Sequence, residues 1–187
     1  MARVMFDSTT PDAIPANAAI VGGYVDGSYA WPAAAWARFP DAQQVRITVT
    51  ADPALGNCLD VEKGDAAPDQ APGWIKARQA AEVKFVTIYC NRSTLPAVDA
   101  ACAGLTYYRW VATLDGTLYV PGFTAMAGPA AVQFAGSGMA GANVDISIVW
   151  EDGWHPIPAQ SLPAQALTDA EAVATAAGNL VTLLKGA

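Results

Sequence analysis

The chain has 187 residues, of which 53% are hydrophobic and 14% are charged, a length and composition that suit one domain of moderate size with a buried core. The formal net charge is −7, and Lys and Arg form no cluster along the sequence. Nucleic acids and anionic membrane surfaces both attract clustered cations, so we expect neither as a partner.

The predicted elements alternate between strands and helices through the first two thirds of the chain. Apolar, β-branched segments predict eight strands, and runs of good helix formers predict helices between some of them. In chain order the elements are strand Val4–Asp7, strand Ala19–Val25, helix Tyr29–Phe39, strand Val45–Thr50, strand Asn57–Glu62, helix Gly73–Val83, strand Phe85–Tyr89, helix Leu95–Ala103, and strands Tyr108–Ala112, Ala131–Phe134 and Val144–Val149.

This order predicts an α/β fold with parallel β-α-β units in the early part of the chain. The last strands have short or Gly-rich connections such as residues 136–141, which leave no room for a crossover helix. The segment between Thr50 and Asn57 is also too short for a helix. We therefore expect a compact, modified TIM-like β/α barrel, smaller than the usual ~250 residues, with an open sheet as the alternative.

The C-terminal part differs in composition from the rest. We expect the barrel domain over residues 1–154, a Pro-rich linker over 155–167 and an amphipathic helix over 168–187. Thr168 and Glu171 form a capping-box pattern at the start of that helix. Its apolar stripe would either pack on the barrel or bind a protein partner.

The N-terminus does not resemble a secretory signal peptide, because Asp7 precedes any long apolar run. We expect synthesis in the cytoplasm, with any extracellular target reached by lysis, a holin or a virion. The three cysteines, Cys58, Cys90 and Cys102, show no metal-binding spacing, and a single histidine, His155, cannot make a His-rich site. We expect buried thiols and no metal or other cofactor; a Cys58–Cys90 bridge remains open.

Four acidic residues stand at or within predicted strands: Asp7 in the first, Asp60 and Glu62 in the fourth, and Asp145 in the eighth. Residues two apart on a strand share a face, so Asp60 and Glu62 point the same way. The first and last strands of a closed barrel are neighbours, which would bring Asp7 beside Asp145. Such a group of acids suits glycoside hydrolysis. Taken singly, Asp7 could cap a helix, Asp145 could serve a loop, and the pair could be a solvated strand end.

Three aromatic residues, Tyr24, Tyr89 and Trp110, lie near predicted strand ends, where rings can stack on sugars or fill the core. Gln133 is a lone polar residue in an apolar strand. Its buried amide needs a partner, which a substrate or a neighbouring acid could supply.

The order of these segments resembles glycoside hydrolase family 25, the N-acetylmuramidase lysozymes of bacteria and phages. A related group of glycoside-hydrolase-like barrel domains in actinobacteria is also similar. The resemblance covers about residues 4–150, with Asp-x-Glu as its best single motif. It rests on Phe6-Asp7-Ser8, Gly23-Tyr24-Val25, Leu59-Asp60-Val61-Glu62, Ile88-Tyr89-Cys90, Trp110-Val111-Ala112, Gln133-Phe134 and Val144-Asp145-Ile146.

The resemblance implies a barrel whose last strands lack helices and an enzyme that acts on peptidoglycan glycan strands. It implies that Glu62 is the general acid and that Asp60 is the nucleophile or the stabiliser of an intermediate. Asp7 and Asp145 would orient the substrate, while Tyr89 and Trp110 would contact sugars. The chain departs from the family in its short barrel and its lack of a recognisable cell-wall-binding repeat.

Two hypotheses therefore stand side by side. The first is a lysozyme-like endolysin, associated with a phage or an actinobacterium. The second is an inactive barrel that serves as a glycan-binding or virion assembly module, since fold does not by itself imply activity.

Overall fold

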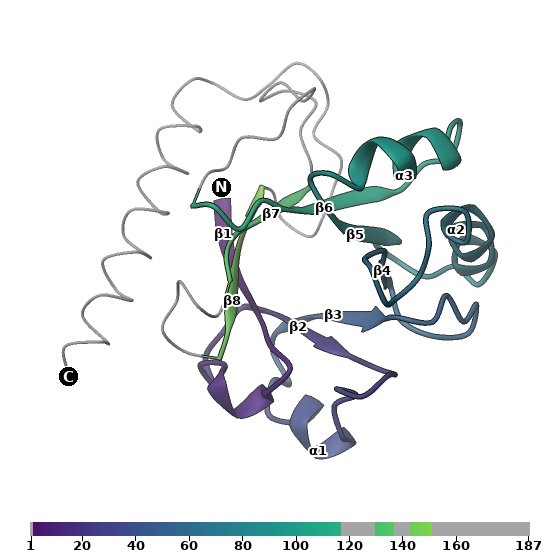
Figure 1. Ribbon diagram of the computed structural model, residues 1–187. Coiled ribbons are helices and arrows are strands. Elements are labelled where there is room, and N and C mark those ends of the chain that lie inside the picture. Colours follow the sequence, from purple (N-terminus) through teal and green to yellow (C-terminus); the bar gives the residue numbers. More distant parts are fainter. Residues whose placement is uncertain (1, 117–129, 137–142, 151–187) are drawn as a thin grey trace.

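The computed structural model describes residues 2–116, 130–136 and 143–150. Its eight strands close into one barrel and follow each other in chain order around it (Figure 1). The strands are β1 (Ala2–Asp7), β2 (Ile20–Tyr24), β3 (Gln43–Thr48), β4 (Cys58–Asp60), β5 (Thr87–Asn91), β6 (Tyr108–Ala112), β7 (Ala131–Ala135) and β8 (Asp145–Trp150). The closed, mixed α/β barrel predicted from the sequence is thus confirmed, and the open sheet is excluded.

Strand direction changes at one place in the barrel. Strands β1 to β7 pair in parallel, each with the next. Strand β8 runs antiparallel to both of its neighbours, β7 and β1. The sequence predicted parallel β-α-β units for the early part of the chain, and the connection before the last strand is too short for a parallel crossover.

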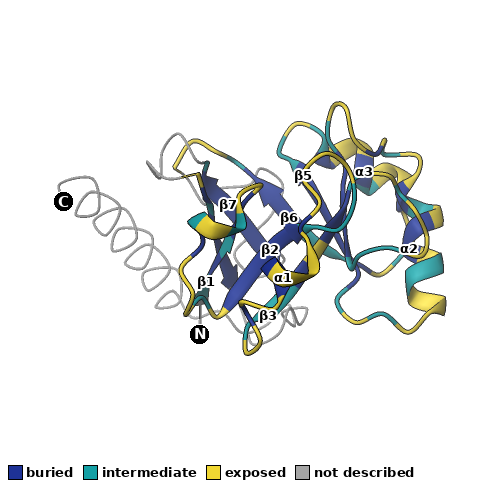
Figure 2. Ribbon diagram, turned by 90° about the horizontal axis from the view of Figure 1, so that it is seen from below, coloured by how far each residue is buried: buried dark blue, intermediate teal, exposed yellow. Residues whose placement is uncertain are grey.

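The described helices are few and lie outside the ring of strands (Figure 1). They are the 3₁₀ turn η1 (Pro11–Ala13) and the α-helices α1 (Ala33–Trp36), α2 (Ala71–Ala80) and α3 (Leu95–Ala101). As expected, no helix joins β3 to β4. Figure 2 shows buried strands and exposed outer surfaces on the helices.

Helix α1 is much shorter than the predicted span Tyr29–Phe39, so that prediction was wrong in extent. Ala30 instead forms a parallel bridge with Tyr24. Trp31 precedes Pro32, and a residue before proline is disfavoured in the helical region. Pro40 follows Phe39 directly and ends the segment.

The core has an inner and an outer part. The inner part fills the barrel and includes Met5, Ile20, Ile47, Cys58 and Trp110. The outer part lies between the strands and the surrounding segments, with one cluster around Trp74 of α2 and another around Trp31, Trp36 and Phe39. Both faces of most strands are therefore covered, which explains their almost continuous apolar sequence.

All three cysteines are buried free thiols, as predicted. Cys58 belongs to the inner core, whereas Cys90 and Cys102 belong to the outer one, so no Cys58–Cys90 bridge forms. Within the described ranges, no helix is long and apolar enough to cross a membrane. His155, the Pro-rich linker and the predicted C-terminal helix lie outside the described residues.

Candidate functional site

The four candidate acids converge at one end of the barrel, which we call the acidic end. Asp7 is the last residue of β1, and Asp60 is the last residue of β4. Asp145 is the first residue of β8 and pairs directly with Asp7 across the two strands. Glu62 follows β4 by two residues. The predicted neighbourhood of Asp7 and Asp145 is thus confirmed.

The reversed direction of β8 is what brings Asp145 to the acidic end. Parallel strands present their C-terminal ends at one edge of a sheet, and Asp145 stands at the start of its strand. If β8 ran parallel to β1, this residue would lie at the opposite end of the barrel. The antiparallel register therefore completes the group of acids that a parallel arrangement would have divided.

Glu62 lies beyond β4 rather than inside it, which corrects the predicted strand Asn57–Glu62. The backbone N–H of Val61 donates to the carbonyl of Tyr89 at 2.8 Å, so the chain stays aligned with β5 one residue past Asp60. A turn then begins, in which the N–H of Asp65 donates to the carbonyl of Glu62 at 3.1 Å. Glu62 consequently stands at the rim, half-buried, whereas Asp60 is 2% exposed.

Gln133 finds its partner among the acids, one of the two alternatives that the sequence left open. Its Nε2 donates to Oδ2 of Asp145 at 2.8 Å, and the side chain is buried. Within the described residues, Oε1 of Gln133, Oδ1 of Asp7 and Oδ1 of Asp60 have no hydrogen-bond partner. Three buried acceptors thus face the acidic end without a donor, an arrangement that is costly for folding alone.

Burial and mutual repulsion raise the pKa values of the two deepest acids. Burial raises the pKa of Asp7 well above its ordinary value, and the charges of Asp145 and Asp60 raise it further. Burial first, then Glu62 and Asp65, raise the pKa of Asp60 to about 8. Every electrostatic neighbour acting on these two carboxyls is another acid, so Asp60 holds a proton near neutral pH.

Glu62 has a different environment. Burial raises its pKa, while a hydrogen bond from the Asn91 side chain opposes that shift and the charges of Asp65 and Asp145 add to it. Oδ1 of Asn91 accepts hydrogen bonds from the N–H and hydroxyl of Thr94 at 2.9 and 3.0 Å. The amide is therefore oriented with its NH₂ group toward Glu62.

The three candidate aromatics all point into the barrel. Tyr89 and Trp110 pack together with ring centroids 4.6 Å apart, and the Trp110 indole N–H donates to Oγ of Ser147 at 3.0 Å. Trp110 is only 1% exposed, so its ring is part of the floor beneath the acids. Tyr24, at the end of β2, is only partly buried and lies nearer the surface.

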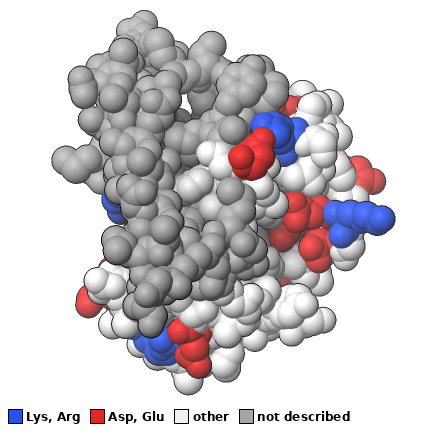
Figure 3. All heavy atoms as spheres, turned by 60° about the vertical axis from the view of Figure 1, so that its left-hand side comes forward, with Lys and Arg blue, Asp and Glu red and all other residues white. Residues whose placement is uncertain are grey.

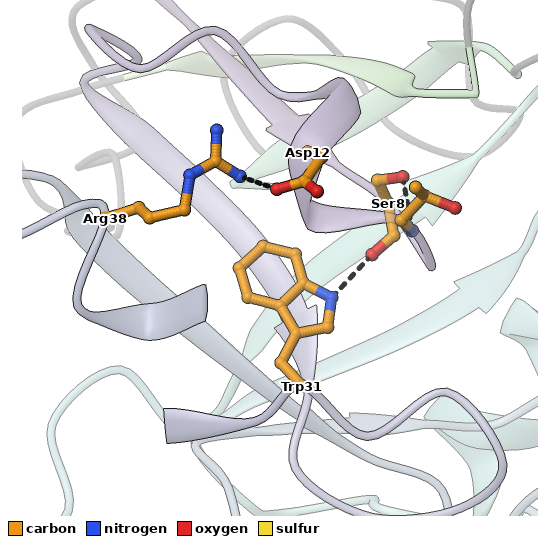
Figure 4. A network of polar contacts seen from close by, with 5 residues as sticks. Ser8, Asp12, Trp31 and Arg38 are labelled. Atoms are coloured by element: carbon orange, nitrogen blue, oxygen red, sulfur yellow. Dashed lines mark hydrogen bonds and ion pairs between the residues drawn. The ribbon is translucent and has the colours of Figure 1, made fainter. Parts of the chain in front are cut away.

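The chain leaving β1 is tied to the chain entering β8, which fixes Asp7 relative to Asp145. The Ser8 hydroxyl donates to the carbonyl of Asn143, whose side-chain amide donates to the Thr10 hydroxyl at 2.7 Å. The Trp31 indole N–H donates to the Ser8 carbonyl at 2.9 Å (Figure 4). Asp7 is thus the end of a strand, and the helix-capping alternative does not hold.

Gly22 makes room for Asp7, and we predict that Gly22→Ala destabilises the protein. It pairs with Asp7 in the parallel ladder, and an added Cβ would stand 2.7 Å from the Asp7 Cβ. We expect a loss of about 1–3 kcal/mol in the free energy of unfolding, measured by chemical denaturation. Gly73→Ala in α2 is the control, because a Cβ there meets nothing within 4 Å; an equal loss in that variant would contradict the steric explanation.

Three residues of this site were not predicted from the sequence: Gly22, Asn91 and Ser147. Each lies two positions from a predicted site residue, on the same inward face of β2, β5 or β8. The two-residue period of a strand was the signal that could have found them.

The described part of the chain contains no group of His, Cys, Asp and Glu residues that could hold a metal ion. On the face shown in Figure 3, acidic and basic side chains form small separate groups among uncharged residues. Comparison of the chain with protein-family models, curated proteins and solved structures found no match.

Proposed function

We propose that this protein is a peptidoglycan-cleaving glycosidase that hydrolyses the β-1,4 bond after N-acetylmuramic acid. The observation that carries the proposal is the convergence of Asp7, Asp60, Glu62 and Asp145 at one end of a closed barrel. Two-carboxylate hydrolysis needs one protonated carboxyl and a second acid close to the developing positive charge. The resemblance to glycoside hydrolase family 25 supports the same assignment.

Glu62 is the general acid in this proposal. It stands at the rim, where a glycosidic oxygen can reach it, and burial raises its pKa, which keeps a larger fraction protonated. The Asn91 side chain partly offsets this rise in pKa by favouring the ionised carboxylate.

Asp60 stabilises the oxocarbenium-like transition state from below. In the free protein its pKa is about 8, because burial and the nearby acids disfavour its charge. Asp60 acts in its ionised form, which is reached when the carboxyl releases its proton to water before the glycosidic bond breaks, and the positive charge that develops on the sugar favours that form. Stabilisation that appears mainly in the transition state raises the rate of the chemical step.

Asp7, Asp145 and Gln133 orient the sugar. The acceptor oxygens of Asp7, Asp60 and Gln133 that lack a donor match the hydroxyl and amide donors of a glycan. Tyr24 and Tyr89 add ring surface near these acceptors, and the buried Trp110 supports them. The proposal requires no cofactor.

The barrel would be a modified TIM-like β/α barrel of the glycoside hydrolase type, followed by the linker and the C-terminal helix. The protein would act at the cell wall as an endolysin-like protein of a phage or an actinobacterium, after release or within a virion. Its helix would pack on the barrel or bind a protein partner.

One observation favours the second candidate function, a glycan-binding or virion assembly module without catalysis. Asp60 and Asp7 are 2% and 5% exposed, which is deep for groups that must meet a substrate. A module of this kind would bind glycan strands and release no product.

The two candidates are separated by the chemistry of the released ends. Purified peptidoglycan is incubated with the protein, reduced with borohydride and hydrolysed. A muramidase yields reduced muramic acid, and a glucosaminidase yields reduced glucosamine. Reduced muramic acid supports the proposal. Absence of both products from actinobacterial and other bacterial walls, with binding retained, favours the module.

A further inference from the structure

Tyr29, in the segment between β2 and α1, is the most exposed large hydrophobic side chain among the described residues. Its side chain is 60% exposed, and the next one, Leu114, is 46% exposed. The ring of an exposed tyrosine offers an apolar face and a polar tip to a ligand.

The segment that carries Tyr29 is fixed at both ends. The N–H of Val25 donates to the carbonyl of Ile47 at 2.8 Å, and the N–H of Trp31 donates to the carbonyl of Tyr24 at 2.8 Å. The Asp26 carboxylate accepts hydrogen bonds from the Thr48 hydroxyl at 2.6 Å and from the Val49 N–H at 2.8 Å. A ring on such a segment loses little freedom when a ligand binds.

Tyr29 also adjoins the acidic end. Its ring lies 6.4 Å from that of Tyr24, at an interplanar angle of 54°. The charges of Asp60, Asp7 and Asp145 act on Tyr24 and, after burial, contribute to raising its pKa. Tyr24 thus lies between the acids and the exposed ring of Tyr29. The two tyrosines extend the site from the acids toward the outer surface.

The surroundings select the kind of ligand. The acids of the acidic end disfavour an anionic group placed directly among them, and the flat, amphipathic ring of tyrosine suits the apolar face of a sugar with its hydroxyls at the rim. We infer that Tyr29 is the platform of an outer sugar-binding subsite, which holds the ring next to the one above the acids. The identity of the glycan rests on the proposed function; the position of the subsite rests on the contacts of Tyr24 and Tyr29.

The test compares a peptidoglycan tetrasaccharide with the corresponding disaccharide, by calorimetry on the full chain carrying Glu62→Gln to prevent cleavage. The tetrasaccharide can reach the outer subsite, and the disaccharide need not. Adding Tyr29→Leu, which keeps an apolar side chain but not the flat ring, should weaken tetrasaccharide binding about tenfold. Disaccharide affinity should change less than twofold. Tyr29→Phe should restore tetrasaccharide affinity.

The outcomes separate this inference from the proposed function. Equal tetrasaccharide affinity with Tyr29 and with Leu at this position overturns the subsite, as does an absence of tetrasaccharide binding to the Glu62→Gln chain. If the wild-type chain releases no reduced muramic acid but the length preference depends on Tyr29, the subsite stands and the hydrolase proposal fails. If the wild-type chain releases reduced muramic acid but shows no length preference that depends on Tyr29, the hydrolase proposal stands and the subsite fails.

Discussion

Glu62→Gln is expected to reduce peptidoglycan cleavage by about 10²–10⁴-fold, the usual contribution of a general acid. Glutamine has nearly the shape of protonated glutamic acid but cannot give a proton to the leaving oxygen. Glu62 is half-buried at the rim of the barrel, outside β4, so its replacement disturbs little of the core. The loss should appear in kcat rather than in glycan affinity, because a proton transfer is made only in the transition state.

The matched control is Glu82→Gln, which makes the same chemical change at an exposed residue that follows α2. It should cleave dye-labelled peptidoglycan at the wild-type rate. Circular dichroism and denaturation should show that both variants are folded. A Glu62→Gln protein that keeps more than a tenth of the wild-type kcat would remove Glu62 from the role of general acid and leave Asp60 as the next acid to replace.

The sequence predicted the barrel well because its strands carry a local signal. Tyr108–Ala112 was predicted with the observed limits of β6, and it contains the β-favouring residues Tyr108, Trp110 and Val111. The observed limits of other strands differ from the predicted ones, because tertiary contacts determine where those strands begin and end. Phe85, predicted as the first residue of a strand, has a φ of +60° and precedes β5. A positive φ of this kind is set by the surrounding chain and leaves no mark in a β-rich sequence.

The direction of β8 was not predicted, although the short connection before it indicates an antiparallel strand. Its residues alternate between the inside and the outside of the barrel in either direction, so the pattern that predicts the strand does not predict its orientation. The pairing of Asp7 with Asp145 was nevertheless predicted correctly, because the closure of the ring places β1 beside β8. The antiparallel register between β1 and β8 then aligns the two residues directly.

The polar contacts of the site were the least predictable part. Asn91 and Ser147 are ordinary polar residues in sequence, and their roles depend on Glu62, which follows β4, and on Trp110 of β6. By contrast, the Asp60-x-Glu62 spacing is local and was recognisable. Local spacing therefore identified the acids, whereas the groups that orient them required the closed barrel.

Asp60→Asn is expected to stabilise the protein at pH 8, by roughly 5 kcal/mol, while it lowers cleavage. Burial, then the charges of Glu62 and Asp65, raise the pKa of Asp60 to about 8, whereas an unfolded aspartate titrates near ~3.9. Between these values the folded state binds more protons than the unfolded state, so the free energy of unfolding falls as pH rises. The contribution of Asp60 is fully present below about pH 4 and is lost as pH rises through about 8.

The measurement is chemical denaturation of wild type and variant between pH 4 and pH 9. The wild-type stability should fall across this range more steeply than that of the variant, and the two curves should separate most at the alkaline end. Asp41→Asn, at an exposed position, is the control and should leave the slope unchanged. A variant less stable than wild type at every pH would mean that the Asp60 carboxyl forms contacts that the fold requires.

A gain of stability from Asp60→Asn would also bear on function. A neutral amide of the same shape would then suit the barrel better than the acid, so folding alone would not explain why an aspartate stands there. Groups that cost stability in the free protein are typical of sites arranged for a ligand or a transition state. Lost cleavage in the same variant would identify the transition state as the reason, whereas retained cleavage with weaker glycan affinity would assign Asp60 to binding.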